Sequence, residues 1–142
     1  MTLARFKAPL VTITAEDTVE KAARVMRDRH VGCLIVTRHG RPAGVVTDRD
    51  LVVRVVAAGR GPATTAVGEF VTYDPITVSV REGIETAVER MRRHGVRRLP
   101  VVDDEGIAVG IVTADDLLVL LGGEIAAVCE GIENRADAED SR

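Results

Sequence analysis

The sequence predicts an α/β (α+β) fold, with one domain built from two pseudo-symmetric β-α-β-β-α units. The first observation is an internal repeat, because residues 40–51 return as residues 106–117, displaced by 66 positions. The second is a helical pattern of apolar residues that occurs once in each copy. The third is a pair of wholly apolar strands per copy, which need cover on both faces. Two copies within 142 residues favour one closed domain over an open array of repeats.

Each copy is expected to begin with a short strand, at residues 10–13 and 76–80, followed by an amphipathic helix. Apolar residues in these helices recur at i, i+3, i+4 and i+7, the spacing of one helix face. They are Val19, Ala22, Ala23 and Met26 in the first copy, and Ile84, Ala87, Val88 and Met91 in the second. Asp17 and Glu20 have the spacing of an N-cap and its reciprocal partner.

Two further strands and a second helix complete each copy. The strands are expected at residues 33–37 and 44–47 in the first copy, and at residues 99–102 and 110–113 in the second. The Gly- and Pro-containing segment 59–65 is the predicted linker, which divides a first unit (1–62) from a second (63–122). Residues 123–142 are expected to form a C-terminal helix with a polar, frayed tail from residue 133.

The composition narrows the classes of function. A net charge of −3 and only three aromatic residues disfavour binding of a nucleic acid. The Arg-rich stretch 90–98 is the sole feature that supports such binding. The apolar runs are too short to span a membrane and the N-terminus lacks the core of a signal peptide, so we expect a cytoplasmic protein without membrane contact. Cys33, Cys129 and the three histidines lack metal-ligand spacing, so no metal is expected.

A Thr-x-x-Asp-Leu motif stands at the entrance to the second helix of each copy, as Thr47, Asp50 and Leu51 and as Thr113, Asp116 and Leu117. Two interpretations remain open. The motif has the form of a helix capping box, in which hydroxyl and carboxylate satisfy backbone amides. It also lies where a strand runs into a helix N-terminus, the place where α/β proteins bind phosphorylated ligands. A capping carboxylate retains spare acceptor capacity, so both interpretations can hold.

Together these motifs resemble a tandem CBS-domain pair, also called a Bateman module. The resemblance rests on the paired Gly-hydrophobic-hydrophobic-Thr-x-x-Asp-Leu motifs, on the strand at residues 99–102 (Leu-Pro-Val-Val), and on the helix openings at residues 18–22 and 83–87. It covers roughly residues 8–122. It implies two units packed through their sheets with two clefts between them, adenine nucleotides bound in the clefts, and modules paired into dimers.

The same resemblance implies particular ligand contacts. Thr47 and Asp50 would serve one cleft and Thr113 and Asp116 the other, with Thr on phosphate or ribose and Asp on the ribose hydroxyls. The base would lie against the first and middle strands, at Val11, Thr12, Ile35, Thr77, Val78 and Pro100. The sequence departs from the family pattern at residues 70–72 (Phe-Val-Thr), and copy one has Ile35 at the position where copy two has Pro100. These departures put equal occupancy of the two clefts in doubt.

Charge adds a further difference between the copies. Possible phosphate contacts are Arg49, His94, Arg97 and Arg98. The copy-one counterparts of the last three are Arg29, Gly32 and Cys33, and the counterpart of Arg49 is Asp115. The alternative interpretation of the stretch 90–98 is a solvated helix face. The two clefts are therefore expected to be unequal.

The leading functional hypothesis is a non-enzymatic regulatory module that binds an AMP-, ADP- or ATP-like nucleotide as a regulatory ligand and signals to an unidentified protein in trans. No catalytic residues and no cofactor are expected, because no nucleophile–base pair, P-loop or metal-bound water is recognisable. The alternative is a ligand-free interaction or structural module of the same fold. A homodimer is expected, because the helix at residues 116–121 is apolar nearly all the way round.

Overall fold

The computed structural model describes residues 2–5, 8–73 and 75–140. Its regular elements are, in chain order, β1 (Thr12–Thr14), α1 (Val19–Arg29), β2 (Cys33–Arg38), β3 (Arg41–Thr47), α2 (Asp48–Leu51), β4 (Thr72–Tyr73), β5 (Val78–Ser79), α3 (Ile84–His94), β6 (Arg98–Val102), β7 (Ala108–Thr113) and α4 (Ala114–Asp140). A π-helical segment, Val52–Val56, continues α2, and 3-10 turns occur at Leu3–Arg5 and Val67–Glu69.

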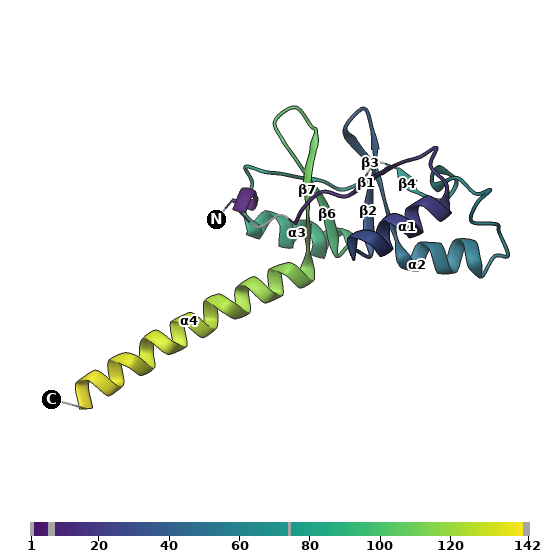
Figure 1. The fold of residues 1–142 in the computed structure, drawn as a ribbon. Helices are drawn as coiled ribbons and strands as arrows, with labels where there is room; N and C mark the ends of the chain where they lie inside the picture. The colour runs from purple at the N-terminus through teal and green to yellow at the C-terminus, as the bar shows by residue number, and fades with distance from the viewer. Residues whose placement is uncertain (1, 6–7, 74, 141–142) are drawn as a thin grey trace.

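The predicted β-α-β-β-α order is confirmed in both copies. In the first unit β1 pairs parallel with β2, which pairs antiparallel with β3. In the second unit β5, β6 and β7 repeat this arrangement. The two sheets lie side by side, with α1 and α2 toward the right of the view, α3 toward the left, and both hairpin turns at the top (Figure 1).

The apolar helix faces cover the two cores. Val19, Ala22 and Met26 of α1 are buried, as are Ile84, Ala87 and Met91 of α3. The predicted faces were one residue too wide, because Ala23 and Val88 are exposed. The buried residues of each helix follow the spacing i, i+3 and i+7, so the face that packs on the core is narrower than the pattern predicted.

The N-cap of α1 also differs from the prediction. Thr18, in extended conformation, accepts a hydrogen bond from the Lys21 amide, so Thr18 and not Asp17 is the cap. The Asp17 carboxylate instead accepts from the Thr14 amide at 2.9 Å and from Lys21 Nζ at 2.7 Å. Asp17 therefore fixes the turn that precedes the helix.

The cores do not follow the predicted division between residues 62 and 63. Leu3, from the start of the chain, is fully buried in the core of the second unit. Val67, Phe70 and Val71, which follow the linker, lie in the core of the first. Strand β4 likewise pairs with β3 of the first sheet. Each unit thus completes its core with a segment from the other side of the division, and the two form one structural body.

The C-terminal helix is longer and more continuous than expected. Instead of a separate helix after residue 122 and a frayed tail from residue 133, α4 runs unbroken through 27 residues and projects from the body (Figure 1). Gly122 and Gly123 each cost about 1 kcal/mol of helix propensity relative to Ala, but the Leu, Ala and Glu residues around them favour the helix. Within the described chain, no helix is long and apolar enough to cross a membrane.

Candidate functional site

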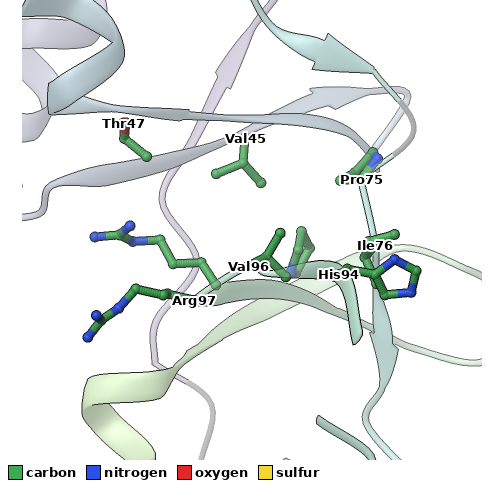
Figure 2. A pocket seen from close by; sticks show the side chains of 9 residues that line it. Val45, Thr47, Pro75, Ile76, His94, Val96 and Arg97 are labelled. Atoms are coloured by element: carbon green, nitrogen blue, oxygen red, sulfur yellow. The ribbon is translucent and has the colours of Figure 1, made fainter. Parts of the chain in front are cut away.

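A pocket of about 450 Å³ opens where the end of β3 faces the start of β6, and we call it the Thr47 pocket. Thr47 and Val45 come from the first unit and the remaining residues from the second: Pro75, Ile76, His94, Val96, Arg97, Arg98 and Pro100. Figure 2 shows Arg97 toward the Thr47 end, whereas His94 lies beside Ile76 and Pro75 at the other end. The pocket therefore has a cationic end and walls of Val, Ile and Pro side chains, with His94 at the other end.

A second pocket of about 570 Å³, the Thr113 pocket, takes most of its lining from the first part of the chain, whereas the Thr47 pocket takes most of its lining from the second unit. It takes Ile111, Thr113, Asp115 and Asp116 from the second unit, and Ala8, Pro9, Val11, Arg29, Val31 and Cys33 from the first part of the chain. The repeat relates the two linings: Ile111 corresponds to Val45, Val31 to Val96, and Cys33 to Arg98. The two pockets are pseudo-symmetric in position but differ in charge.

In the Thr47 pocket the Thr-x-x-Asp motif forms a closed capping box. The Asp50 carboxylate accepts from the Thr47 amide at 2.9 Å and from its hydroxyl at 3.0 Å. The Asp50 amide in turn donates to Thr47 Oγ1 at 3.2 Å. The second Asp50 oxygen lies 3.8 Å from Nε of Arg54. The capping interpretation is confirmed here, and Asp50 is not among the lining residues.

The second motif is only half closed. The Asp116 amide donates to Thr113 Oγ1 at 3.1 Å. Among the described residues, the Asp116 carboxylate has no hydrogen-bond partner, and it is exposed at the rim of the Thr113 pocket. Its oxygens are consequently available to accept hydrogen bonds from hydroxyl groups of a ligand.

Charged side chains lie between and within the pockets. Arg97 Nη2 is 2.7 Å from Oδ1 of Asp115, so one ion pair joins a residue of each pocket. Arg98 makes no ion pair within the described chain and lies near enough to Cys33 to influence it. Burial is the main influence on Cys33 and raises the pKa of its thiol to about 11, while Arg98 opposes this shift. Cys33 is thus a neutral thiol at neutral pH.

The structure brings together eight of the predicted contact residues and leaves six aside. Those that line a pocket are Thr47, Thr113, Asp116, Val11, Pro100, His94, Arg97 and Arg98. Those that do not are Asp50, Thr12, Ile35, Thr77, Val78 and Arg49. Ile35 and Val78 are buried within the sheets, whereas Thr12 and Arg49 are exposed elsewhere on the surface.

Several lining residues were missed from the sequence. They are Val45, Pro75, Ile76 and Val96 in one pocket, and Ala8, Pro9, Arg29, Val31, Cys33, Ile111 and Asp115 in the other. The repeat contained a signal for six of them. Val45 corresponds to Ile111 and Pro9 to Pro75 at a displacement of 66 positions, and Val31 corresponds to Val96 at a displacement of 65. What the repeat did not contain was the pairing across units, in which each Thr faces the strand start of the other copy.

The sequence profile of the CBS domain family matches residues 5–57 and 67–123. The chain belongs to the CBS domain family. Its two matches make it a tandem CBS-domain pair, as the motifs predicted. No group of three or more His, Cys, Asp or Glu side chains that could hold a metal ion occurs in the described part of this CBS pair.

Individual relatives agree with this assignment. An uncharacterized protein of Methanopyrus kandleri is 36% identical over 110 residues, which is 77% of this chain but only 56% of that protein. The crystal structure of Hypoxic Response Protein I with two coordinated zinc ions is 31% identical with a TM-score of 0.74, covering 83% of this chain and 97% of that one. A CBS domain protein from Pyrobaculum aerophilum complexed with AMP is 29% identical with a TM-score of 0.74, covering 82% and 90%.

Proposed function

We propose that this CBS pair is a regulatory module that binds an adenine nucleotide. We assign the phosphate of the nucleotide to the Thr47 pocket. The observation that carries the proposal is the convergence of Thr47, Arg97 and Arg98 on a pocket whose other lining residues, apart from His94, are apolar. Arginine provides paired donors for phosphate oxygens, and apolar walls of this size accept a planar base. The AMP complex of the Pyrobaculum relative supports the same ligand class.

A ligand panel tests the proposal directly. Thermal unfolding is measured with AMP, ADP, ATP, S-adenosylmethionine and NAD, because a ligand at 100 times its Kd stabilises the native state by about 2.7 kcal/mol. We expect at least one nucleotide to raise the Tm. Arg98→Gln should reduce that shift, whereas Arg92→Gln, on the exposed face of α3, should leave it unchanged. No shift with any nucleotide would favour the alternative, a ligand-free interaction module.

The proposal assigns no catalytic reaction to this chain, and a partner protein would respond to the bound nucleotide in trans. Incubation of the protein with the bound nucleotide, followed by chromatography of the ligand, should return it unchanged. A stoichiometric or turnover-dependent product would contradict this part of the proposal and indicate an enzyme.

We further propose a homodimer joined through α4. Five large apolar side chains of this helix are exposed by 43% to 65%, and they follow a 3-4-3-4 spacing: Leu118, Leu121, Ile125, Val128 and Ile132. This is the heptad pattern of a helix that pairs with another helix. Neighbouring positions hold small residues, Gly122, Cys129 and Gly131, which permit close approach. Exposed Glu124 and Glu130 make an anionic membrane surface a poor alternative occupant.

Light scattering tests the dimer. We expect twice the single-chain mass of 15.2 kDa for the wild type and the single mass for Leu118→Glu or Ile125→Glu. Val119→Glu is the matched control, because Val119 is also apolar and is 78% exposed but lies outside the 3-4-3-4 positions. A monomeric wild type, or a control that dissociates as readily as the two variants, would refute the interface.

A further inference from the structure

We infer that the Arg97–Asp115 ion pair couples the two pockets, so that a phosphate bound in the Thr47 pocket weakens binding of a second phosphate in the Thr113 pocket. This inference rests on the proposed nucleotide binding and adds a direction of regulation to it. Arg97 lines the first pocket and Asp115 the second, and their side chains meet at 2.7 Å. Among the ion pairs of the described residues, it alone joins the two linings.

The pair is positioned by the backbone. The amide of Ala114, next to Asp115, donates to the carbonyl of Arg97 at 2.9 Å, which holds the start of α4 beside the start of β6. The first unit has the equivalent hydrogen bond, from the Asp48 amide to the Gly32 carbonyl at 3.0 Å. There the side chains corresponding to Arg97 and Asp115 are Gly32 and Arg49, which cannot form an ion pair. The link therefore exists on one side of the pseudo-symmetric molecule.

The exposure of the pair allows its partners to exchange. The side chains of Arg97 and Asp115 are 69% and 74% exposed, and ion pairs in such positions are weak. A phosphate at the Thr47 end carries more charge than one carboxylate and competes for the Arg97 guanidinium. Asp115 then loses its cation and stands with Asp116 at the rim of the Thr113 pocket.

Charge in the second pocket determines the sign of the coupling. Its titratable lining contains the carboxylates Asp115 and Asp116 and the cation Arg29, besides the Cys33 thiol. Release of Asp115 from Arg97 makes this pocket more negative, so a second phosphate is repelled. An uncharged nucleoside is not repelled and is accepted through hydrogen bonds to Asp116. The two pockets thus favour one phosphorylated and one unphosphorylated ligand at the same time.

The test compares AMP with adenosine by isothermal titration of the full chain. Asp115→Asn removes the competitor of the phosphate and should strengthen the tighter AMP step by roughly 1.5- to 5-fold, the range of an exposed ion pair. The weaker AMP step should also strengthen, whereas adenosine binding should change by less than either. Asp104→Asn, which breaks the exposed Arg81–Asp104 pair away from both pockets, is the matched control and should leave all steps unchanged.

A double-mutant cycle separates the coupling from a general charge effect. In an Arg97→Gln background, Asp115→Asn should no longer strengthen the tighter AMP step, because no guanidinium remains to be released. An equal gain with and without Arg97, or no gain in either, would overturn the inference while AMP binding itself stands. A wild type that binds no nucleotide would overturn both the inference and the proposed function.

Discussion

The two copies of the Thr-x-x-Asp-Leu motif begin their helices in different ways. In the first unit the Asp50 carboxylate is bound by the amide and hydroxyl of Thr47, and α2 soon gives way to the π-helical segment Val52–Val56. In the second, Asp116 contributes only its amide to the cap and the helix continues for 27 residues. The same sequence pattern therefore holds the Asp50 carboxylate within a helix cap and leaves the Asp116 carboxylate available to a ligand.

The difference shows that a motif by itself does not assign a role to its carboxylate. The residues around each Asp decide whether its oxygens are already occupied. Asp50 lies near Arg54, whose counterpart in the second unit is Leu120, and this cation helps to hold the carboxylate in the cap. Asp116 makes no ion pair with any residue that the structure describes, and it remains at the pocket rim.

The largest effect is expected where the two copies are alike. Leu51 and Leu117 end the motifs and are buried to 8% and 3% exposure. Leu51→Ala and Leu117→Ala should each lower the free energy of unfolding by about 2–5 kcal/mol, because each leaves a cavity in a core. Urea denaturation measures both. A loss below about 1 kcal/mol in one variant would show that its core is not packed as described.

The next prediction separates the two carboxylates. Asp50→Asn should cost about 1 kcal/mol of stability through the weakened capping box, with little change in nucleotide affinity. Asp116→Asn should leave stability nearly intact. It should weaken ligand binding in the Thr113 pocket by about 1.5–3 kcal/mol, because a charge-assisted acceptor is lost.

Urea denaturation and isothermal titration on both variants measure the two quantities. Unchanged affinity in both would reduce the motif to a pair of helix caps. The opposite result, with Asp50→Asn as the binding variant, would reverse the assignment of the two sites.

The sequence was sufficient for the features that depend on local pattern. Uninterrupted apolar runs and the helical spacing of apolar residues predicted the order of strands and helices. The strand-to-helix transition predicted Thr47 and Thr113 in the pockets. The same local signals could not choose between Asp17 and Thr18 as the cap of α1, because both have cap chemistry and only the backbone conformation at Thr18 decides.

The features that escaped prediction depend on contacts between distant segments. Leu3 enters the second core and Phe70 the first, and no local pattern indicates that exchange. For the same reason Val78 was expected against a base, although its side chain is fully buried beneath the sheet. The cross-unit pairing of the two pockets is likewise a product of how the sheets pack.

A smaller effect should appear in the acid stability of the two units. Asp17 and Glu82 occupy equivalent turns before the first helices. The hydrogen bond from Lys21 is the main cause that lowers the pKa of Asp17, and the hydrogen bond from the Ser79 amide, aided by Arg90, lowers the pKa of Glu82. Because folding lowers both pKa values, their stabilisation is present above the ordinary pKa of each acid. It is lost as the pH falls through the folded-state value.

Urea midpoints at neutral pH and at roughly pH 3.5 measure this contribution. The acid-induced loss should shrink in Glu82→Gln more than in Asp17→Asn, because Glu82 makes two hydrogen bonds to Arg90 and Asp17 only one to Lys21. Equal losses in the wild type and both variants would mean that other carboxylates dominate the acid transition.

The smallest effect concerns Cys33, which lines the Thr113 pocket at the position that corresponds to Arg98 in the Thr47 pocket. The pKa of about 11 leaves the Cys33 thiol protonated at neutral pH, and a protonated thiol is a poor nucleophile. Cys129 is exposed on α4, so Cys129→Ala should change stability by no more than about 0.5 kcal/mol. In that variant the remaining Cys33 should react slowly with dithionitrobenzoate in the native state and rapidly in urea. Rapid native labelling of Cys33 would mean that the Thr113 pocket is more open, and its thiol more acidic, than the packing around β2 implies.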